Sequence, residues 1–208
     1  MEHKIIVVGI GPGSPDYLVP IAKGKIDEAK VLVGSRRALA DYSTAEQVSK
    51  AVDKDIASVM LFISKQLLVS DVVVMVSGDP GYYSLLPALR QYFPDKTFEV
   101  IPGISSFQLA FARVNQPWQA AKLLSMHGRE VASAELAYQE GQTLSFLTDA
   151  VHNPQSIAKL LIVRGWPETV TTHLCANLSY EQETIVTLSL AQVTATSGFD
   201  HSVMVVKG

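Results

Sequence analysis

The sequence has a single cysteine, Cys175, among its 208 residues. One cysteine cannot form a disulfide within the chain, and no cluster of Cys and His has the spacing of a zinc site. This scarcity indicates a reducing compartment, and we expect the cytoplasm. No apolar run reaches the ~20 residues that a membrane-spanning helix needs, and no signal peptide precedes the first apolar run, so we expect no membrane partner.

Charged residues are also few, at 18%, and the formal net charge is −3. A nucleic-acid-binding protein usually presents a basic face, so this balance argues against a nucleic-acid partner. An anionic small-molecule substrate stays compatible with it, because a local group of arginines can act within an acidic protein. Hydrophobic residues make up 48% of the chain, which is enough to bury a core and excludes a disordered chain.

The first half of the chain alternates short apolar runs with amphipathic stretches. Continuous apolar runs predict buried parallel strands, whereas apolar residues at three- and four-residue steps predict helices. Such an order is typical of an α/β fold with a mainly parallel sheet, in which the turns after the strands gather at one edge. The predicted strands are 5–8, 31–33, 72–76 and 98–101, and the predicted helices are 18–29, 56–67, 83–91 and 104–114.

The pattern changes near Asn115-Gln116-Pro117, where we expect a domain boundary. This gives an N-terminal α/β domain, residues 1–115, and a C-terminal α/β domain, residues 116–208. The second domain is expected to have a mixed sheet, in which the last two strands are antiparallel neighbours. Its predicted elements are a helix at 156–163 and strands at 144–147, 170–176, 184–190 and 202–206.

Three loops rich in glycine and proline follow predicted strands of the first domain. The first is no dinucleotide fingerprint, because Ser14 stands where the third glycine belongs and Pro12 lacks an N–H for a phosphate. Considered singly, each loop is also explained as a tight turn or a capped helix start, with Asp79 as the cap in the second. The loops are Gly9-Ile10-Gly11-Pro12-Gly13-Ser14-Pro15-Asp16, Ser77-Gly78-Asp79-Pro80-Gly81-Tyr82 and Pro102-Gly103-Ile104-Ser105-Ser106.

Taken together, the three loops resemble the tetrapyrrole methylase family, whose members use S-adenosylmethionine. The resemblance extends over the whole chain and includes Phe146-Leu147-Thr148-Asp149 and Ala176-Asn177-Leu178-Ser179. It implies two α/β domains with S-adenosyl-L-methionine in the cleft between them, a C-methyltransferase activity and a homodimer. By this resemblance the cofactor site comprises Pro12, Ser77, Gly78, Asp79, Tyr82, Ser105, Ser106, Leu147, Asn177 and Leu178.

Two stretches resemble the branch of this family that methylates carbon 5 of a cobalt-precorrin in cobalamin biosynthesis. One is Gly34-Ser35-Arg36-Arg37, with Ser35 where uroporphyrinogen methylases carry an aspartate, and the other is Ser125-Met126-His127-Gly128-Arg129. The substrate would be an anionic tetrapyrrole, and arginine binds carboxylates through paired hydrogen bonds. We therefore expect Arg36, Arg37 and Arg129 to bind substrate and His127 to move a proton as the catalytic residue.

Other interpretations stay open at this point. Arg36 and Arg37 are also explained as a solvated surface pair, and a lone histidine is more often structural. The chain could be a sibling methylase acting at another precorrin position or on uroporphyrinogen, or a non-catalytic sensor that binds S-adenosylmethionine. Cobalt would arrive inside the substrate, so we expect no metal site. Because the chain carries no decarboxylating methyltransferase domain, a separate partner enzyme of the same pathway is expected.

Overall fold

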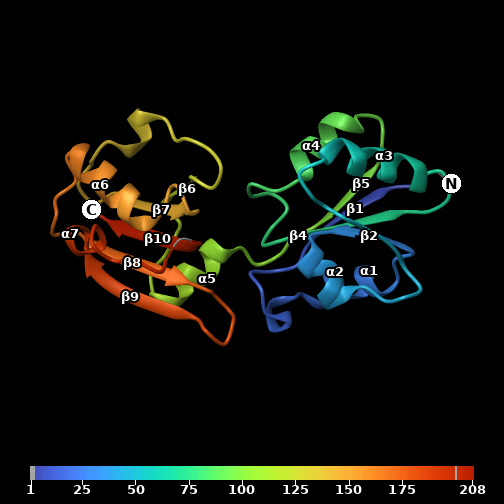
Figure 1. Cartoon of the computed structure of the whole chain (residues 1–208), viewed down its shortest axis with the longest axis horizontal. Helices are drawn as coiled ribbons and strands as arrows, with labels where there is room; N and C mark the ends of the chain where they lie inside the picture. The colour runs from blue at the N-terminus through green and yellow to red at the C-terminus, as the bar shows by residue number, and fades with distance from the viewer. Residues whose placement is uncertain (1–2, 200) are drawn as a thin grey trace. The chain divides into compact units, whose positions relative to one another are not determined.

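Two compact units make up the chain, and each contains one five-stranded sheet (Figure 1). The computed structural model describes residues 3–199 and 201–208. The first unit comprises Met1–Ser105 and the second Ser106–Gly208. The division falls before the expected boundary after residue 115, because helix α5 (Ser106–Arg113) groups with the second unit, where it contacts the sheet.

In the sheet of the first unit, every pair of neighbouring strands is parallel, and the strand order is β3-β2-β4-β1-β5. All residues of β1, β2 and β4 are buried, which is why continuous apolar runs mark them in the sequence. In chain order the elements are β1 (Ile5–Gly9), the 3-10 helix η1 (Pro15–Tyr17), α1 (Pro20–Asp27), β2 (Val31–Gly34), α2 (Arg36–Tyr42), β3 (Val48–Ala51), α3 (Ile56–Gln66), β4 (Val72–Val76), α4 (Leu86–Tyr92) and β5 (Phe98–Ile101).

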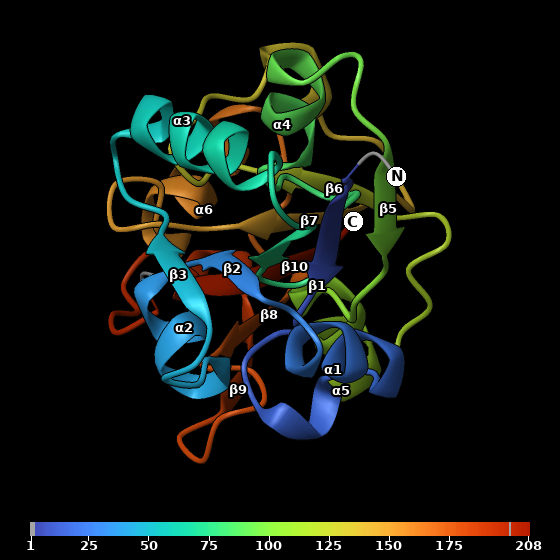
Figure 2. The same ribbon diagram turned by 90° about the vertical axis from the view of Figure 1, so that its right-hand side faces the viewer.

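Helices cover both faces of this sheet, with α1 and α2 on one face and α3 and α4 on the other (Figure 2). Strand side chains alternate between the faces: Val7 packs in the same cluster as Ile63 of α3, and Val8 in the same cluster as Ala22 of α1. Neighbouring strands β1 and β4 therefore send the chain to opposite faces, to α1 and to α4. Open α/β sheets bind ligands at such a switch point, outside the carboxyl ends of the strands.

The sheet of the second unit is mixed and has the order β6-β7-β10-β8-β9. Strands β6 and β7 are parallel, whereas β10 is antiparallel to β7 and β8, and β9 is antiparallel to β8. Both sheets match the predicted fold class, which is confirmed. After α5 the elements are β6 (Lys122–Ser125), the 3-10 helix η2 (Ser133–Leu136), β7 (Thr143–Leu147), α6 (Pro154–Val163), β8 (Thr171–Ala176), β9 (Thr184–Ser189), α7 (Leu190–Val193) and β10 (Ser202–Lys207).

The prediction that the last two strands are neighbours is wrong. Strand β10 lies between β7 and β8, and β9 is the edge strand on the far side of β8. The physical reason is burial, because residues 202–206 are buried along their whole length, whereas β9 is half exposed. A strand buried on both faces gains most from a place inside the sheet, where neighbours on both sides satisfy its backbone groups.

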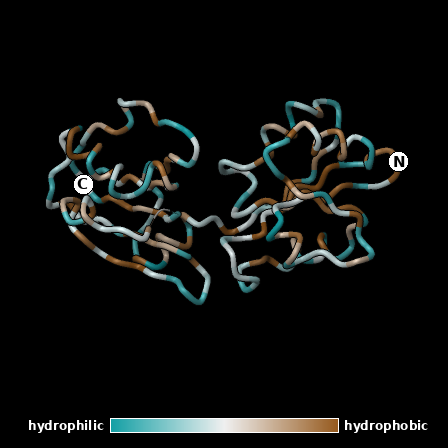
Figure 3. Tube along the Cα trace, in the orientation of Figure 1, coloured by the Kyte–Doolittle hydropathy of each residue, from teal (hydrophilic) through white to brown (hydrophobic). Residues whose placement is uncertain are grey.

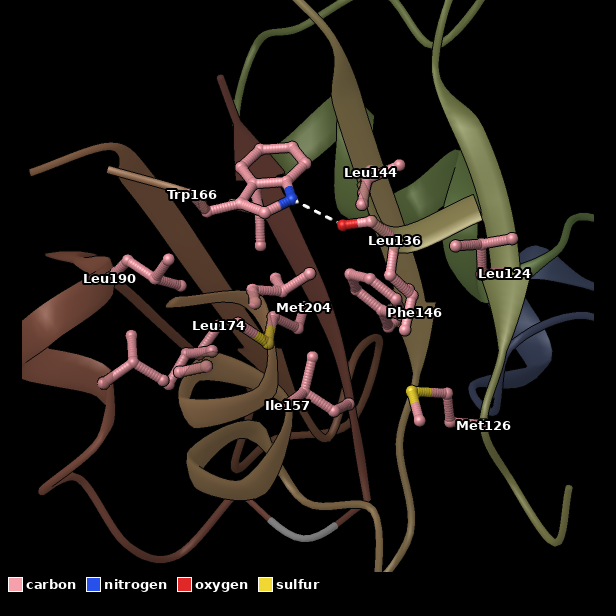
Figure 4. Close-up of a cluster of buried hydrophobic side chains, with 14 residues drawn as sticks. Leu124, Met126, Leu136, Leu144, Phe146, Ile157, Trp166, Leu174, Leu190 and Met204 are labelled. Carbon is pink, nitrogen blue, oxygen red and sulfur yellow. Dashed lines mark hydrogen bonds between the residues drawn. The ribbon is translucent and has the colours of Figure 1, made fainter. Parts of the chain in front are cut away.

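One face of the second sheet packs against α6 and α7 to form a hydrophobic core (Figure 4). Trp166, which follows α6, is 2% exposed, and its indole N–H donates to the carbonyl oxygen of Leu136 at 2.8 Å. This bond ties the long segment between β6 and β7 to the core. Hydrophobic residues concentrate along the strands of each unit, and hydrophilic residues in the connecting segments (Figure 3). Among the described residues no helix is long and apolar enough to cross a membrane.

Candidate functional site

Glycines allow three loops to meet at the carboxyl edge of the first sheet. Gly11 and Gly78 form an isolated antiparallel bridge, in which the Gly78 N–H donates to the Gly11 carbonyl oxygen at 2.8 Å. A Cβ built on Gly103 would lie 2.3 Å from the Gly78 carbonyl oxygen and 2.8 Å from the Cα of Gly9. A side chain at Gly9 or Gly103 would therefore collide with backbone. We call these four residues the glycine junction, and it joins the loops after β1, β4 and β5.

The carboxylate of Asp79 adds a second link between two of these loops. Its Oδ1 accepts from the N–H of Gly81 at 2.7 Å, and its Oδ2 accepts from the N–H of Gly103 at 3.1 Å. The alternative that Asp79 caps the following helix is wrong, since α4 begins at Leu86 with Leu85 as its N-cap. Asp79 instead fixes the loop after β5 against the loop after β4.

Other residues expected to bind the cofactor lie in the same loops. Gly78 has a φ of 67°, in the left-handed region, and a Cβ there would lie 3.5 Å from the Cα of Ser105. The Tyr82 N–H donates to the Asp79 carbonyl oxygen at 3.2 Å, and its ring stacks edge-on against Tyr83 at 4.5 Å between centroids. The structure thus brings together the predicted residues of the first unit, Pro12, Ser77, Gly78, Asp79, Tyr82 and Ser105.

The two arginines after β2 differ in their surroundings. Both lie in the first turn of α2, whose N-cap is Ser35; the Ser35 Oγ accepts from the N–H of Ala38 at 3.1 Å. Arg37 donates from Nη1 to the Gly13 carbonyl oxygen at 3.5 Å and lies 3.7 Å from Asp41. Arg36 is exposed, and its side chain makes no hydrogen bond or ion pair with any residue that the structure describes. Two cations at a helix N-terminus are unfavourable for the helix, so its stability does not explain this pair.

Several loops also meet at one edge of the second sheet. Strands β6, β7 and β8 run in the same direction and end there, and antiparallel β10 begins there. Ser106, which is also a predicted cofactor residue, is the first residue of α5. The edge carries the remaining predicted residues, which are His127, Arg129, Leu147, Asn177 and Leu178.

Asp149, which follows β7, connects two of the loops at this edge. Its Oδ2 accepts from the N–H of Gly128 at 2.7 Å, and its Oδ1 accepts from the N–H groups of Val151 and His152 at 2.8 and 2.6 Å. The hydrogen bonds from Gly128 and then His152 lower the pKa of Asp149 to about 2, because they stabilise the ionised form. The sequence offered a signal for this residue, its place in the Phe146–Asp149 stretch, but gave it no role.

His127 lies exposed at this edge, as does Arg129. Its Nδ1 lies 3.4 Å from the carbonyl oxygen of Thr148, and its ring lies 6.0 Å from that of His201. Thr148 itself is buried, and its Oγ1 accepts from the N–H of Ser202 at 2.8 Å. The imidazole is therefore exposed to solvent and contacts a buried residue, so a ligand can reach it.

Glu183 holds the loop after β8. Its Oε1 accepts from Arg113 Nε at 2.6 Å and its Oε2 from the N–H of Ser179 at 2.7 Å. The hydrogen bond from Arg113 is the larger cause of a lowered pKa for Glu183. In the loop, Asn177 adopts a φ of 51° and is exposed, whereas Leu178 is buried. The side-chain amide of Asn177 is therefore exposed to solvent, on a loop that the bond between Ser179 and Glu183 holds in place.

A comparison with known proteins shows that most of the chain matches one protein family. The sequence profile described as Tetrapyrrole (Corrin/Porphyrin) Methylases matches residues 4–194. The cobalt-precorrin-7 C(5)-methyltransferase of Salmonella typhimurium strain LT2 is 31% identical over 191 residues, which cover 92% of this chain and 93% of that protein.

Solved structures share the fold. The precorrin-6Y methylase of cobalamin biosynthesis from Archaeoglobus fulgidus aligns with a TM-score of 0.73 at 24% identity, covering 100% of this chain and 98% of that one. The uroporphyrin-III C-methyl transferase of Thermus thermophilus, complexed with S-adenosyl homocysteine, aligns with a TM-score of 0.81 at 20% identity, covering 98% and 97%. At these identities the likeness concerns the fold alone.

Substitution of Gly103 by alanine tests the glycine junction. The added Cβ would force the backbone of Gly78 to move, so we expect the free energy of unfolding to fall by about 1–3 kcal/mol in a urea titration. Gly24→Ala is the matched control, because nothing lies within 4 Å of a Cβ at this position in α1. There alanine should stabilise the helix by about 0.5–1 kcal/mol. Wild-type stability of Gly103→Ala would mean that the three loops are not in contact as described.

Proposed function

We propose, since this chain belongs to the tetrapyrrole (corrin/porphyrin) methylase family, that it transfers a methyl group from S-adenosyl-L-methionine to carbon 5 of cobalt-precorrin-7 in cobalamin biosynthesis. The observation that carries the proposal is the match with the Salmonella carbon-5 methyltransferase over nearly the full length of both proteins. Two local features support it. One is the exposed Arg36 after β2, and the other is the turn that contains His127 and Arg129, which Asp149 binds through the N–H of Gly128.

The residues at the two sheet edges fit S-adenosylmethionine in their chemistry. In the first unit, Ser77 and Ser105 offer hydroxyl groups, which suit the polar amino-acid and ribose parts, and Gly78, whose φ lies in the left-handed region, has no side chain to obstruct a ligand. In the second unit, Leu147 and Asn177 offer apolar surface and an amide, which suit adenine. The proposed contacts are Pro12, Ser77, Gly78, Asp79, Tyr82, Ser105, Ser106, Leu147, Asn177 and Leu178.

The cofactor supplies a sulfonium methyl group when bound, so methyl transfer to a nucleophilic ring carbon needs no nucleophile from the protein. The chain contributes alignment, because one ring carbon among many must meet that methyl group. Arg36 and Arg129 are proposed to orient the macrocycle by its carboxylates through paired hydrogen bonds. Arg37 is proposed to assist, although Gly13 and Asp41 already occupy part of its guanidinium.

His127 is proposed to accept the proton that the methylated carbon releases. In the tautomer whose Nδ1–H donates to the Thr148 carbonyl oxygen, Nε2 is left as a base. The exposed position of the ring makes Nε2 reachable for a ligand.

A direct assay tests the proposed activity. Incubation of the protein with S-adenosylmethionine and cobalt-precorrin-7 should give a singly methylated product and S-adenosylhomocysteine, both detected by mass spectrometry. Calorimetry should show binding of S-adenosylhomocysteine and none of NAD. Cofactor binding without methylation of any tetrapyrrole would instead identify a sensor. Methylation of uroporphyrinogen or another precorrin in place of cobalt-precorrin-7 would assign the chain to a sibling branch.

Substitution of the exposed arginines tests substrate binding. Arg36→Ala and Arg129→Ala should each weaken binding of cobalt-precorrin-7 roughly ten- to hundredfold, the loss expected for a hydrogen bond between charged groups. Their affinity for S-adenosylhomocysteine should stay within about twofold of wild type, because the two arginines are proposed to contact the tetrapyrrole and not the cofactor. His127→Ala should lower kcat more than binding, because proton transfer matters only in turnover.

Arg164→Ala is the matched control for the arginine variants. Arg164 is an exposed arginine just after α6, whereas Arg129 follows the carboxyl end of β6. This control should bind both ligands like wild type. If Arg36→Ala and Arg129→Ala lose cofactor affinity as much as tetrapyrrole affinity, the two arginines support the cofactor site or the fold instead.

We also propose that the protein is a cytoplasmic homodimer that works with a separate decarboxylating methyltransferase. The single cysteine supports a reducing compartment, and apolar side chains exposed on and after α3, Leu61 at 55% and Leu68 at 80%, support an interface. Light scattering at micromolar concentration should give twice the chain mass of 22.6 kDa. A mass of one chain throughout that range would contradict the dimer.

A further inference from the structure

The carboxylate of Asp149 reaches across the sheet edge to a turn that lies 21 positions earlier in the chain. We propose that Asp149 is a positioning residue for tetrapyrrole binding, which holds the His127-Gly128-Arg129 turn in the conformation that presents His127 and Arg129 to the substrate. The proposal rests on the proposed function and assigns to this one side chain the task of ordering part of the substrate site.

The turn itself has little packing to fix it. All residues from His127 to Glu130 are exposed, and a Cβ on Gly128 would meet nothing within 4 Å. Gly128 adopts a φ of 66°, which glycine allows but does not enforce. The hydrogen bond from its N–H to Asp149 Oδ2, at 2.7 Å, holds this conformation together with the longer contact between His127 Nδ1 and the Thr148 carbonyl oxygen, at 3.4 Å. A bond to an ionised acceptor is roughly twice as strong as one between neutral groups.

Asp149 can act as a tether because it is fixed at its own position. Its Oδ1 closes a local turn by accepting from the N–H groups of Val151 and His152. The preceding residue, Thr148, is buried and bonds to Ser202 of β10 through both its backbone N–H and its hydroxyl group. The two oxygens thus have separate tasks, Oδ1 in the local turn and Oδ2 in the link to Gly128.

This division of tasks gives a substitution that cuts the link and keeps the local turn. In Asp149→Asn, the amide oxygen can still accept from Val151 and His152, whereas the amide nitrogen in place of Oδ2 cannot accept from the Gly128 N–H. The reverse orientation would lose two bonds to save one, so the first is favoured. A preorganised turn binds its ligand without an ordering cost, and a released turn loses that advantage.

The link is tested without substrate by hydrogen exchange of the Gly128 amide, followed by NMR. Asp149→Asn should speed this exchange about tenfold or more, as expected for the loss of a charged hydrogen bond. Asp55→Asn is the matched control, because Asp55 also bonds through its carboxylate to a backbone N–H, that of Ser58, but in the first unit. Unchanged exchange in Asp149→Asn would overturn the proposal at its first step.

The positioning role is tested by titration with cobalt-precorrin-7 and with S-adenosylhomocysteine. Asp149→Asn should weaken binding of cobalt-precorrin-7 about tenfold and leave affinity for S-adenosylhomocysteine within about twofold of wild type. In an Arg129→Ala background the same substitution should cost little further affinity, because the two residues act through one contact. An undiminished loss in that background would mean a merely structural role and would overturn the proposal.

Failure of this proposal can be told from failure of the proposed function. If Arg129→Ala weakens tetrapyrrole binding but Asp149→Asn does not, although the Gly128 amide exchanges faster, the positioning role is wrong and the function stands. If the wild-type protein does not bind cobalt-precorrin-7, the proposed function is wrong, and the positioning role for that substrate falls with it.

Discussion

The close approach of Gly103 to Gly9 and Gly78 is the constraint on which the first unit's site depends. Because a Cβ on Gly103 would lie 2.3 Å from a carbonyl oxygen, only glycine lets the loops after β1, β4 and β5 share one small volume. That volume lies at the switch point of the sheet, where β1 and β4 direct the chain to opposite faces. Asp79 then fixes the loop after β5 against the loop after β4 through backbone N–H groups, so the hydroxyl groups of Ser77 and Ser105 lie on loops that are held in place.

The second unit orders its loops with ionised carboxylates instead of glycine packing. Asp149 accepts backbone N–H groups, whereas Glu183 accepts from Arg113 Nε and from the N–H of Ser179. The bond from Gly128 is the largest cause of the lowered pKa of Asp149, and the bond from Arg113 is the largest cause of the lowered pKa of Glu183. The folded-state pKa of Asp149, about 2, lies below the unfolded value of about 4. Its contribution to stability is therefore fully present above about pH 4 and is lost as the pH falls through about 2. At neutral pH both carboxylates are ionised and hold the two loops, on which His127, Arg129 and Asn177 lie exposed.

The hydrophobic pattern predicted the strands that are buried along their whole length. It did not predict features that depend on residues far apart in the chain, such as the order of the strands in the second sheet. The strands β1 and β4 are continuous apolar runs, and the sequence predicted both. The edge strand β3 and the helix α2 were not predicted, because β3 is only partly buried and contains Lys50, and α2 begins with two arginines instead of apolar residues. The position of β10 between β7 and β8 follows from burial of the whole sheet, which no window of sequence contains. Among the candidate site residues, Asp79 and Arg37 were predicted through the family resemblance. In the structure Asp79 bonds to Gly103 and Arg37 to Gly13, whereas the Arg36 side chain is exposed. The sequence could not predict this difference, because it depends on residues that are distant in the chain.

The proposed function requires that the methyl group reach one particular ring carbon. The most direct measurement uses S-adenosylmethionine labelled with carbon-13 in its methyl group, cobalt-precorrin-7 and the purified protein, with the labelled position located by NMR of the product. We expect the label on carbon 5 alone. A label on another ring carbon, or an unlabelled tetrapyrrole after complete incubation, would contradict it.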